Sequence, residues 1–360
     1  MNIKNISILT AVLAGIAGVL WIAQRSSNPS LKSDLVGQGL LNAEAIGDAQ
    51  SIQIFETAED SPAVEIVKQG DNWIVPKHYG LPVDFQKVSD MISGLAESTI
   101  IRAVTDNPDR IQMLDLGQTR IVFTDASGDS LADISFGKSG NTGGTFAKIE
   151  RSEKVVLASD KPFIQTSADN WAVSKAWELK WDDVRSIVQK GESTGIQLTR
   201  EDAESDFTSK GLEDEVELEQ SEIRTSFTRF TNLRFQDLAK VGSEEVAEAL
   251  EHAKTWDMQT EAGDTFTFTY GRRPEVKAPE PEATEEGGEE ETGEKIEDIP
   301  AGTPYLIVKH NKANELWSGI YETYAFELTS FNFEQLPESI EAFIVEPKPE
   351  EVSEETESEG

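Results

Sequence analysis

The sequence predicts an α+β protein in which an N-terminal transmembrane helix is followed by two similar repeats, each an antiparallel sheet with a packed helix. Three observations predict this fold class. One long uncharged apolar stretch lies near the N-terminus, short alternating apolar runs are separated by turn residues, and the same patterns recur in the same order in the second half. We place the first repeat at residues 46–183 and the second at residues 184–346.

The N-terminal helix is expected at Ile6–Ala23, which contains no charged residue. As a helix this stretch would be about 27 Å long, close to the thickness of the hydrocarbon core of a bilayer. Trp21 lies where an interfacial aromatic residue belongs, and Arg25 follows the apolar stretch. A cleaved signal peptide is the alternative, but no small-x-small site is present there. We therefore expect an uncleaved anchor with residues 1–5 as a cytoplasmic head.

Residues 24–45 are expected to form a tether, because they carry turn-forming residues and only a weak apolar pattern. The short head and the very acidic body favour an N-terminus in the cytoplasm. The expected location is therefore a bacterial inner membrane that is crossed once, with the bulk of the chain in the periplasm.

The first repeat opens with short strands and continues with a helix and further strands. Asp84 is the expected N-cap of the helix, and apolar residues recur along its face at helical spacing. The expected strands are Ser51–Phe55, Ala63–Val67, Trp73–Val75, Arg120–Thr124, Leu131–Phe136, Thr145–Ile149 and Lys154–Ala158, and the buried helix face carries Phe85, Val88, Ile92 and Leu95.

The second half repeats this order. Short matches can arise by chance because hairpins reuse glycine and aspartate, but the shared order favours a duplication. The chain near Ser186 and Ile187, together with Gly195–Thr199, matches the opening strands at Ser51. A helix with Ile223, Phe227, Phe230 and Leu233 on one face matches the first helix. Thr260–Arg272 matches Thr124–Lys138, and the Gly-Thr pair at Gly302 matches the pair at Gly144.

Three acidic stretches interrupt or end the repeats: residues 201–222, 274–298 and 347–360. Such runs cannot bury enough apolar surface to offset the entropy lost on ordering them. We expect the first to be a loop, the second a disordered insertion in the second repeat, and the third a disordered tail. Calcium binding is the alternative for these stretches, but the sequence contains no D-x-D-x-D-G loop.

The composition excludes several classes of function. The formal net charge of −35, from 67 acidic and 32 basic residues, repels phosphate backbones, so no nucleic-acid partner is expected. The absence of cysteine excludes disulfides, thiolate zinc sites and cysteine nucleophiles. The three histidines, His78, His252 and His310, are far apart in sequence. We therefore predict no metal site and no cofactor.

No catalytic motif stands out. Phe136–Gly144 superficially resembles a phosphate-binding loop, but Ala132 occupies the position where such a loop needs its first glycine. The adjacent Asp182 and Asp183 would point apart on a strand or helix, so they are unsuited to act together as acid and base. No G-x-S-x-G sequence is present. We therefore predict no catalytic residue and expect that the chain is not an enzyme.

The seven tryptophans offer one further possibility, a platform on which carbohydrate rings stack. Their apolar strand contexts favour core packing instead. The residues in question include Trp73, Trp171, Trp177, Trp181 and Trp317.

The layout resembles the domain-of-unknown-function family 4340, whose members are bacterial membrane proteins with one N-terminal span. The resemblance covers most of the chain up to about Phe343 and implies an auxiliary role beside ABC-type export systems, including those linked to gliding motility. No biochemical activity is established for the family, so no catalytic residue carries over. The resemblance rests on the apolar stretch Ile6–Ala23, on SIQIFE at Ser51–Glu56, on Glu65–Pro76, on Leu81–Leu95 and on WELKWDDVRSIV at Trp177–Val188.

These observations together predict a membrane-anchored, non-catalytic scaffold or accessory subunit of an envelope complex. Its expected partners are the lipid bilayer, through the N-terminal helix, and an envelope protein such as an ABC-type transporter component. The alternative is an extracytoplasmic module that binds or senses a ligand through its aromatic residues.

Overall fold

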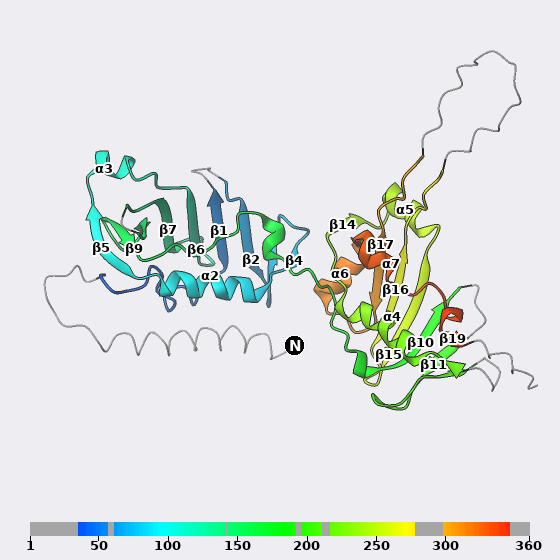
Figure 1. Ribbon diagram of the computed structural model, residues 1–360. Helices are drawn as coiled ribbons and strands as arrows, with labels where there is room; N and C mark the ends of the chain where they lie inside the picture. Colours follow the sequence, from blue (N-terminus) through cyan, green and yellow to red (C-terminus); the bar gives the residue numbers. More distant parts are fainter. Residues whose placement is uncertain are drawn as a thin grey trace, which may run out of the picture. The chain divides into compact units, whose positions relative to one another are not determined.

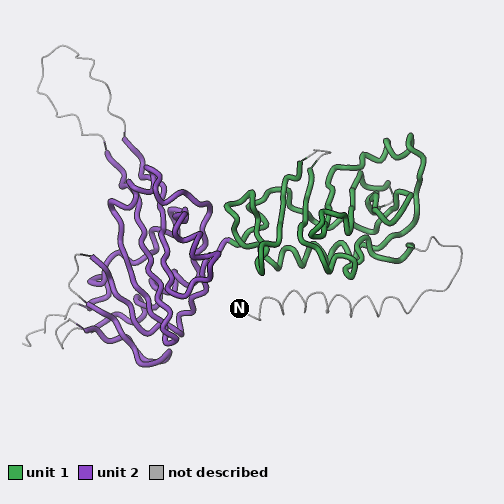
Figure 2. The backbone as a smooth tube through the Cα atoms, turned by 180° about the vertical axis from the view of Figure 1, so that it is seen from behind, with its two compact units in different colours: residues 1–173 green, residues 174–360 purple. Residues whose placement is uncertain are grey.

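The computed structural model describes residues 35–56, 61–141, 143–191, 196–210, 217–277 and 298–345. The expected head, transmembrane helix and tail, most of the acidic insertion and the first part of the expected tether lie outside these ranges. None of the helices within them is long and apolar enough to cross a membrane. The chain forms two compact units, unit 1 at Met1–Val173 and unit 2 at Ser174–Gly360 (Figure 2).

Unit 1 contains a nine-stranded sheet whose pairings are all antiparallel, in the order β4-β3-β2-β1-β6-β7-β8-β9-β5. The helix α2 (Phe85–Glu97) lies along one face of it (Figure 1). The strands are β1 (Ser51–Glu56), β2 (Val64–Gln69), β3 (Asn72–Val75), β4 (Leu81–Pro82), β5 (Ile100–Thr105), β6 (Thr119–Thr124), β7 (Ser130–Ser139), β8 (Thr145–Ile149) and β9 (Val155–Ala158).

The sequence of α2 explains why it forms and how it packs. The Asp84 side chain accepts a hydrogen bond from the Gln86 backbone N–H at 3.1 Å, which satisfies one of the free N–H groups at the helix start. Val88, Ile92 and Leu95 share one face of the helix and are buried. The predicted cap is therefore confirmed, and so is the predicted buried face except at Phe85, which is only half-buried.

Unit 2 contains an eight-stranded antiparallel sheet in the order β12-β11-β10-β15-β16-β17-β18-β14, and a separate two-stranded ladder of β13 and β19. The helix α4 (Gln220–Asn232) packs on the large sheet. The strands are β10 (Val184–Lys190), β11 (Gln197–Thr199), β12 (Thr208–Lys210), β13 (Glu217–Leu218), β14 (Asp237–Lys240), β15 (Lys254–Thr260), β16 (Thr265–Gly271), β17 (Tyr305–His310), β18 (Tyr324–Glu327) and β19 (Ile344–Val345).

Aromatic rings fill the space between α4 and this sheet. Phe227 meets Trp256 edge to face at 4.9 Å between ring centroids, and Phe230 stacks on Phe268 at 4.6 Å. Trp177 lies 5.4 Å from Phe268, and its indole N–H donates to the Phe230 carbonyl oxygen at 2.8 Å. Ring pairs of this kind contribute roughly 0.5–1.5 kcal/mol each beyond the apolar area they bury.

Short helices accompany both sheets. They are α3 (Pro108–Gln112) and the 3-10 helix η1 (Ala168–Trp171) in unit 1, and η2 (Trp181–Asp183), α5 (Glu244–Leu250), α6 (Glu315–Thr323), α7 (Ser330–Glu334) and η3 (Glu341–Phe343) in unit 2.

The two large sheets share one order of strands. The series β3-β2-β1-β6-β7-β8-β9-β5 corresponds strand by strand to β12-β11-β10-β15-β16-β17-β18-β14, and β4 is an additional edge strand in unit 1. The same interval along the chain separates Asp84 from Glu219, the residues that precede α2 and α4, and Thr119 from Lys254, which begin β6 and β15. The matches noted in the sequence therefore fall at corresponding positions of the two sheets.

Two expected boundaries differ from the structure. Residues 35–45, expected to belong to the tether, pack on unit 1: Leu40 and Leu41 are buried, and the Leu40 N–H donates to the Ser98 carbonyl oxygen. Residues 174–183, which precede β10 and were expected to end the first repeat, belong to unit 2. There the Phe235 N–H donates a hydrogen bond to the Ser174 carbonyl oxygen. The division between the units accordingly falls at 173/174 and not at 183/184.

Part of the acidic stretch 201–222 is also more ordered than the loop we expected. It contains β12, β13 and the beginning of α4. Phe207 and Leu218 explain this difference, because both side chains are buried in unit 2 and hold the polar residues around them in place.

His310 at the end of β17 makes stability depend on pH. It stacks on Phe266 at 4.0 Å between ring centroids, and its buried Nε2 has no hydrogen-bond partner among the described residues, since Asp264 at 3.9 Å is too distant to form one. Burial lowers the pKa of His310 below its ordinary value of 6.5, and Lys312 acts in the same direction, whereas Asp264 opposes them. The neutral ring is thus favoured in the folded state.

The contribution of His310 to stability is therefore complete above pH 6.5 and decreases as the pH falls below that value, because the unfolded chain then binds the extra proton. We expect His310→Gln to lose less thermal stability between pH 7.5 and pH 5.5 than the wild-type chain loses. His252→Gln, at an exposed position, is the control and should keep the wild-type difference. An equal loss in the wild-type chain and in His310→Gln would contradict this prediction.

Candidate functional site

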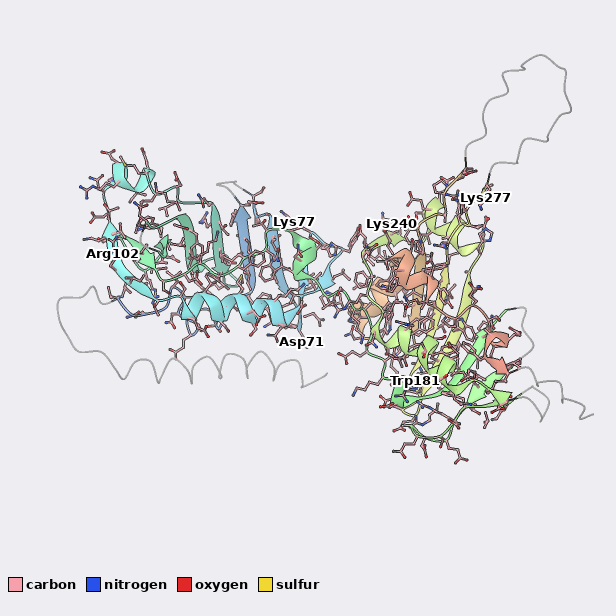
Figure 3. All side chains as sticks on the ribbon, viewed as in Figure 1. Asp71, Lys77, Arg102, Trp181, Lys240 and Lys277 are labelled. Carbon is pink, nitrogen blue, oxygen red and sulfur yellow. The ribbon has the colours of Figure 1, made fainter. Side chains whose placement is uncertain are left out.

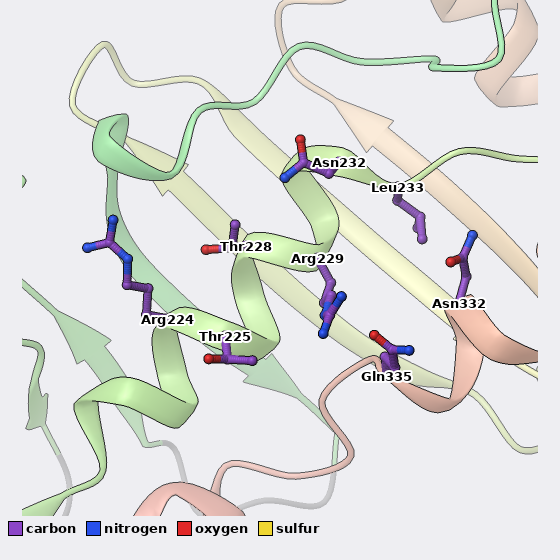
Figure 4. Close-up of a pocket in the computed structure, with 8 residues that line it drawn as sticks. All are labelled: Arg224, Thr225, Thr228, Arg229, Asn232, Leu233, Asn332 and Gln335. Carbon is purple, nitrogen blue, oxygen red and sulfur yellow. The ribbon is translucent and has the colours of Figure 1, made fainter.

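A surface groove of about 390 Å³ lies beside α4 in unit 2 (Figure 4). One wall is the outward face of α4, and the other is the segment that begins with α7. All the lining residues except Leu233 have polar or charged side chains: Arg224, Thr225, Thr228, Arg229, Asn232, Leu233, Asn332 and Gln335.

Two arginines give the groove positive charge within a strongly acidic chain. Arg224 and Arg229 are exposed, and neither forms an ion pair with any residue in the described ranges. Other arginines of unit 2 do form such pairs: Arg185 with Glu261, Arg272 with Glu334 and Arg273 with Glu248. The groove thus offers two guanidinium groups whose donors are available to an external anion.

The neutral lining residues supply further hydrogen-bonding groups. The Thr228 Oγ1 is buried and has no hydrogen-bond partner within the described part of the chain, so it is able to donate to or accept from an occupant. The Asn332 N–H bonds to Thr329 at 2.9 Å, which fixes the start of α7 and so positions the Asn332 side chain at the groove. Gln335 follows directly after α7.

The arrangement favours an elongated occupant. Arg229 extends from α4 on the side of Gln335, whereas Arg224 leaves α4 on the other side of the helix, away from Gln335 (Figure 4). A single small anion would not contact both guanidinium groups in this arrangement. An extended chain with spaced carboxylates would reach both of them.

The corresponding helix face in unit 1 is closed, and the sequence explains the difference. By the interval that relates Asp84 to Glu219, Gly94 of α2 corresponds to Arg229 of α4. A Cβ at Gly94 would lie 2.8 Å from the Cβ of Pro162, so only glycine allows the chain after β9 to pack this closely on α2. In unit 2, an arginine at this position leaves room for a groove.

A second cavity, in unit 1, is too small to bind most ligands. It lies between α2 and the sheet and has a volume of about 60 Å³. Its lining residues are mainly apolar and include Trp73, and Lys68 also lines it. Typical ligand pockets measure about 300–1,000 Å³. In unit 2 the residue that corresponds to Lys68 is Arg200. Its guanidinium group lies 4.8 Å from the ring of Trp181, which is labelled in Figure 3, and 4.9 Å from the Phe207 ring.

The residues considered for chemistry in the sequence do not converge on a site. Gly137 lies within β7, where a Cβ would be 2.3 Å from the Leu114 carbonyl oxygen, so its role is close packing. Asp182 and Asp183 belong to η2. Among the described residues, no group of three or more histidines, aspartates or glutamates is placed to hold a metal ion.

Core packing of the tryptophans is confirmed for Trp171, Trp177 and Trp181, which are buried together with Trp256, whereas Trp73 and Trp317 are half-buried. The sequence reasoning did not identify Arg224 and Arg229. The available signal was two arginines on the polar face of the predicted helix, immediately after a run of acidic residues.

Comparison with known proteins supports the resemblance stated above over a shorter range. The family model described as "Domain of unknown function (DUF4340)" matches residues 73–253, a range that begins in unit 1 and ends in unit 2. No curated protein and no solved structure matches the chain. The matched range includes α2 and α4 and covers half of the chain, and the protein therefore belongs to the DUF4340 family.

Proposed function

We propose that this protein is a non-catalytic accessory subunit of a bacterial envelope complex, of the ABC-type export class, and that the groove beside α4 is where it holds a partner protein. The observation that carries the proposal is the pair of arginines, Arg224 and Arg229, which form no ion pair with a described residue in a chain of net charge −35. In this proposal residues 6–23 anchor the chain once in the inner membrane, with the N-terminus in the cytoplasm. Both units then lie in the periplasm.

The corresponding strand orders support a scaffold built by duplication. In this view each unit keeps the same sheet and helix, and the two units have diverged in the surface beside the helix. Gly94 closes that surface in unit 1, whereas Arg229 accompanies the groove in unit 2. One copy would then serve mainly as structure, and the other would recognise a partner.

The chemistry of the groove favours an acidic protein segment. Carboxylates bind guanidinium groups through charge-assisted hydrogen bonds, and the amide groups of Asn332 and Gln335 add hydrogen-bonding capacity beside them. The net negative charge of the chain repels anionic surfaces in general, so binding requires a segment slender enough to enter the groove.

The test is capture of the full-length protein from its native membrane after mild crosslinking, with mass spectrometry of the proteins recovered. We expect the double substitution Arg224→Glu and Arg229→Glu to reduce recovery of envelope partners by about tenfold, because it reverses both charges that attract the partner. The matched control reverses Arg102, which is labelled in Figure 3, and Arg110; both are exposed in unit 1 and form no ion pair with a described residue.

Equal recovery with both double variants would contradict the proposal. Recovery of the bait alone from wild-type membranes would favour the second function, binding or sensing of a small ligand, for which the groove volume is sufficient. A shift in melting temperature with members of a metabolite panel would then support that second function.

A further inference from the structure

We infer that the groove has an internal ligand: the acidic segment 346–360 of the same chain occupies it and competes with the partner. This inference rests on the proposed function, because it takes the groove to be the docking surface. The segment lies outside the described residues; the place where the described chain ends, the length of the segment and its charge all favour the groove as its binding site.

The last described residues before this segment lie at the beginning of α4. β19 pairs with β13, so that Val345 lies opposite Glu217 and Ile344 opposite Leu218. The Phe343 carbonyl oxygen accepts a hydrogen bond of 2.9 Å from the N–H of Glu219, the residue that precedes α4. Residue 346 therefore follows directly from a strand that is held against the start of the helix that forms the groove.

The reach of the segment is sufficient. Arg224 lies five residues beyond Glu219, which corresponds to a rise of about 7.5 Å along the helix. Fifteen residues span at most about 50 Å when extended. The segment is thus long enough to turn back and pass along both arginines. A tether this short gives an effective concentration in the millimolar range, so weak contacts are sufficient for occupancy.

The charges match. Residues 346–360 contain seven glutamates and one lysine, spaced along the chain, and the groove offers two guanidinium groups that leave α4 on different sides. An extended acidic segment fits this spacing. Because the groove is open to solvent, these ion pairs are screened by salt, and the occupied state is weak enough to yield to a partner.

The absence of cysteine allows a direct test in the full-length protein by disulfide trapping. Thr225→Cys places a thiol in the groove, and Ser353→Cys places one in the acidic segment. We expect this pair to form an intramolecular disulfide under mild oxidation at least fivefold faster than either of two control pairs. One control replaces Thr225→Cys with Asp90→Cys, the corresponding exposed position of α2, and the other replaces Ser353→Cys with Thr284→Cys in the acidic insertion.

Charge is tested on the same pair. Replacing the seven glutamates of 346–360 by glutamine should slow trapping to the control rate, and 0.5 M salt should slow it partly. Equal rates for the pair and its controls, or a rate indifferent to these replacements, would overturn the inference. If trapping fails while partner capture still depends on Arg224 and Arg229, the proposed function stands and only the internal ligand is wrong.

Discussion

Replacing Arg200 with alanine is expected to destabilise unit 2 by about 3–5 kcal/mol. The Arg200 side chain is largely buried, with a residue exposure of 8%. Its Nε donates to the Val184 carbonyl oxygen at 2.8 Å, its Nη1 to that of Ala203 at 3.0 Å, and its Nη2 to that of Trp181. Alanine would remove these three hydrogen bonds and would open a cavity between the Trp181 and Phe207 rings.

A lysine at this position should recover only part of the loss. It keeps the positive charge near the two rings, but its three donors lie on one nitrogen, which cannot be within hydrogen-bond distance of all three carbonyl oxygens that Nε, Nη1 and Nη2 of the guanidinium reach separately. Arg200→Lys is therefore expected to lie between the wild-type chain and Arg200→Ala.

Lys68→Ala is the matched control, because Lys68 occupies the corresponding position in unit 1. The Lys68 N–H donates to the Gln50 carbonyl oxygen just as the Arg200 N–H donates to that of Arg185. Lys68 is exposed, so its removal should change stability by less than about 0.5 kcal/mol.

Hydrogen exchange followed by mass spectrometry is the suitable measurement, because it reports the stability of each unit separately within the full-length chain. Arg200→Ala should raise exchange in β10, β11 and α4 and leave unit 1 unchanged. Equal effects of Arg200→Ala and Lys68→Ala would show that the stacked guanidinium contributes nothing specific.

The elements that could be predicted from the sequence are those that residues close together in the chain mark, through the spacing of apolar residues or through turn-forming residues. The face of α4 was predictable because Ile223, Phe227 and Phe230 recur at helical spacing, and all three are buried. The hairpins were predictable because glycine and aspartate mark their turns, as at Gly128 and Gly263, both of which have positive φ. The periodicity of a long element survives in any tertiary context.

Other elements depend on partners that are distant in sequence. β5 has no alternation to predict it, and it forms because β9 pairs with it at the sheet edge. Leu40 and Leu41 were expected in the tether because two adjacent apolar residues do not show the periodicity of a helix or a strand. They are buried because they pack against α2. The groove beside α4 also depends on contacts between residues that are distant in sequence. In unit 1 Gly94 lets Pro162 pack against α2, whereas in unit 2 the corresponding residue of α4 is Arg229.

Gly271→Ala is expected to destabilise unit 2 by about 2–3 kcal/mol, as overpacking of a tightly packed site does. Gly271 ends β16 and lies against α5, where a Cβ would be 2.2 Å from the Ala249 carbonyl oxygen and 3.0 Å from the Ala253 Cα. Backbone atoms cannot move aside as a flexible side chain can, so α5 must shift. Exchange should increase in α5 and β16.

The corresponding glycine and an unconstrained one distinguish this steric effect from a general intolerance of alanine. At Gly137 the added Cβ would lie 2.3 Å from the Leu114 carbonyl oxygen, so Gly137→Ala should produce a similar loss confined to unit 1. Gly319 in α6 has no atom within 4 Å of the added Cβ, and Gly319→Ala should stabilise its helix by roughly 0.5–1 kcal/mol. Destabilisation by Gly319→Ala, or tolerance of alanine at Gly271, would refute the close approach of helix and strand as the reason for the two glycines.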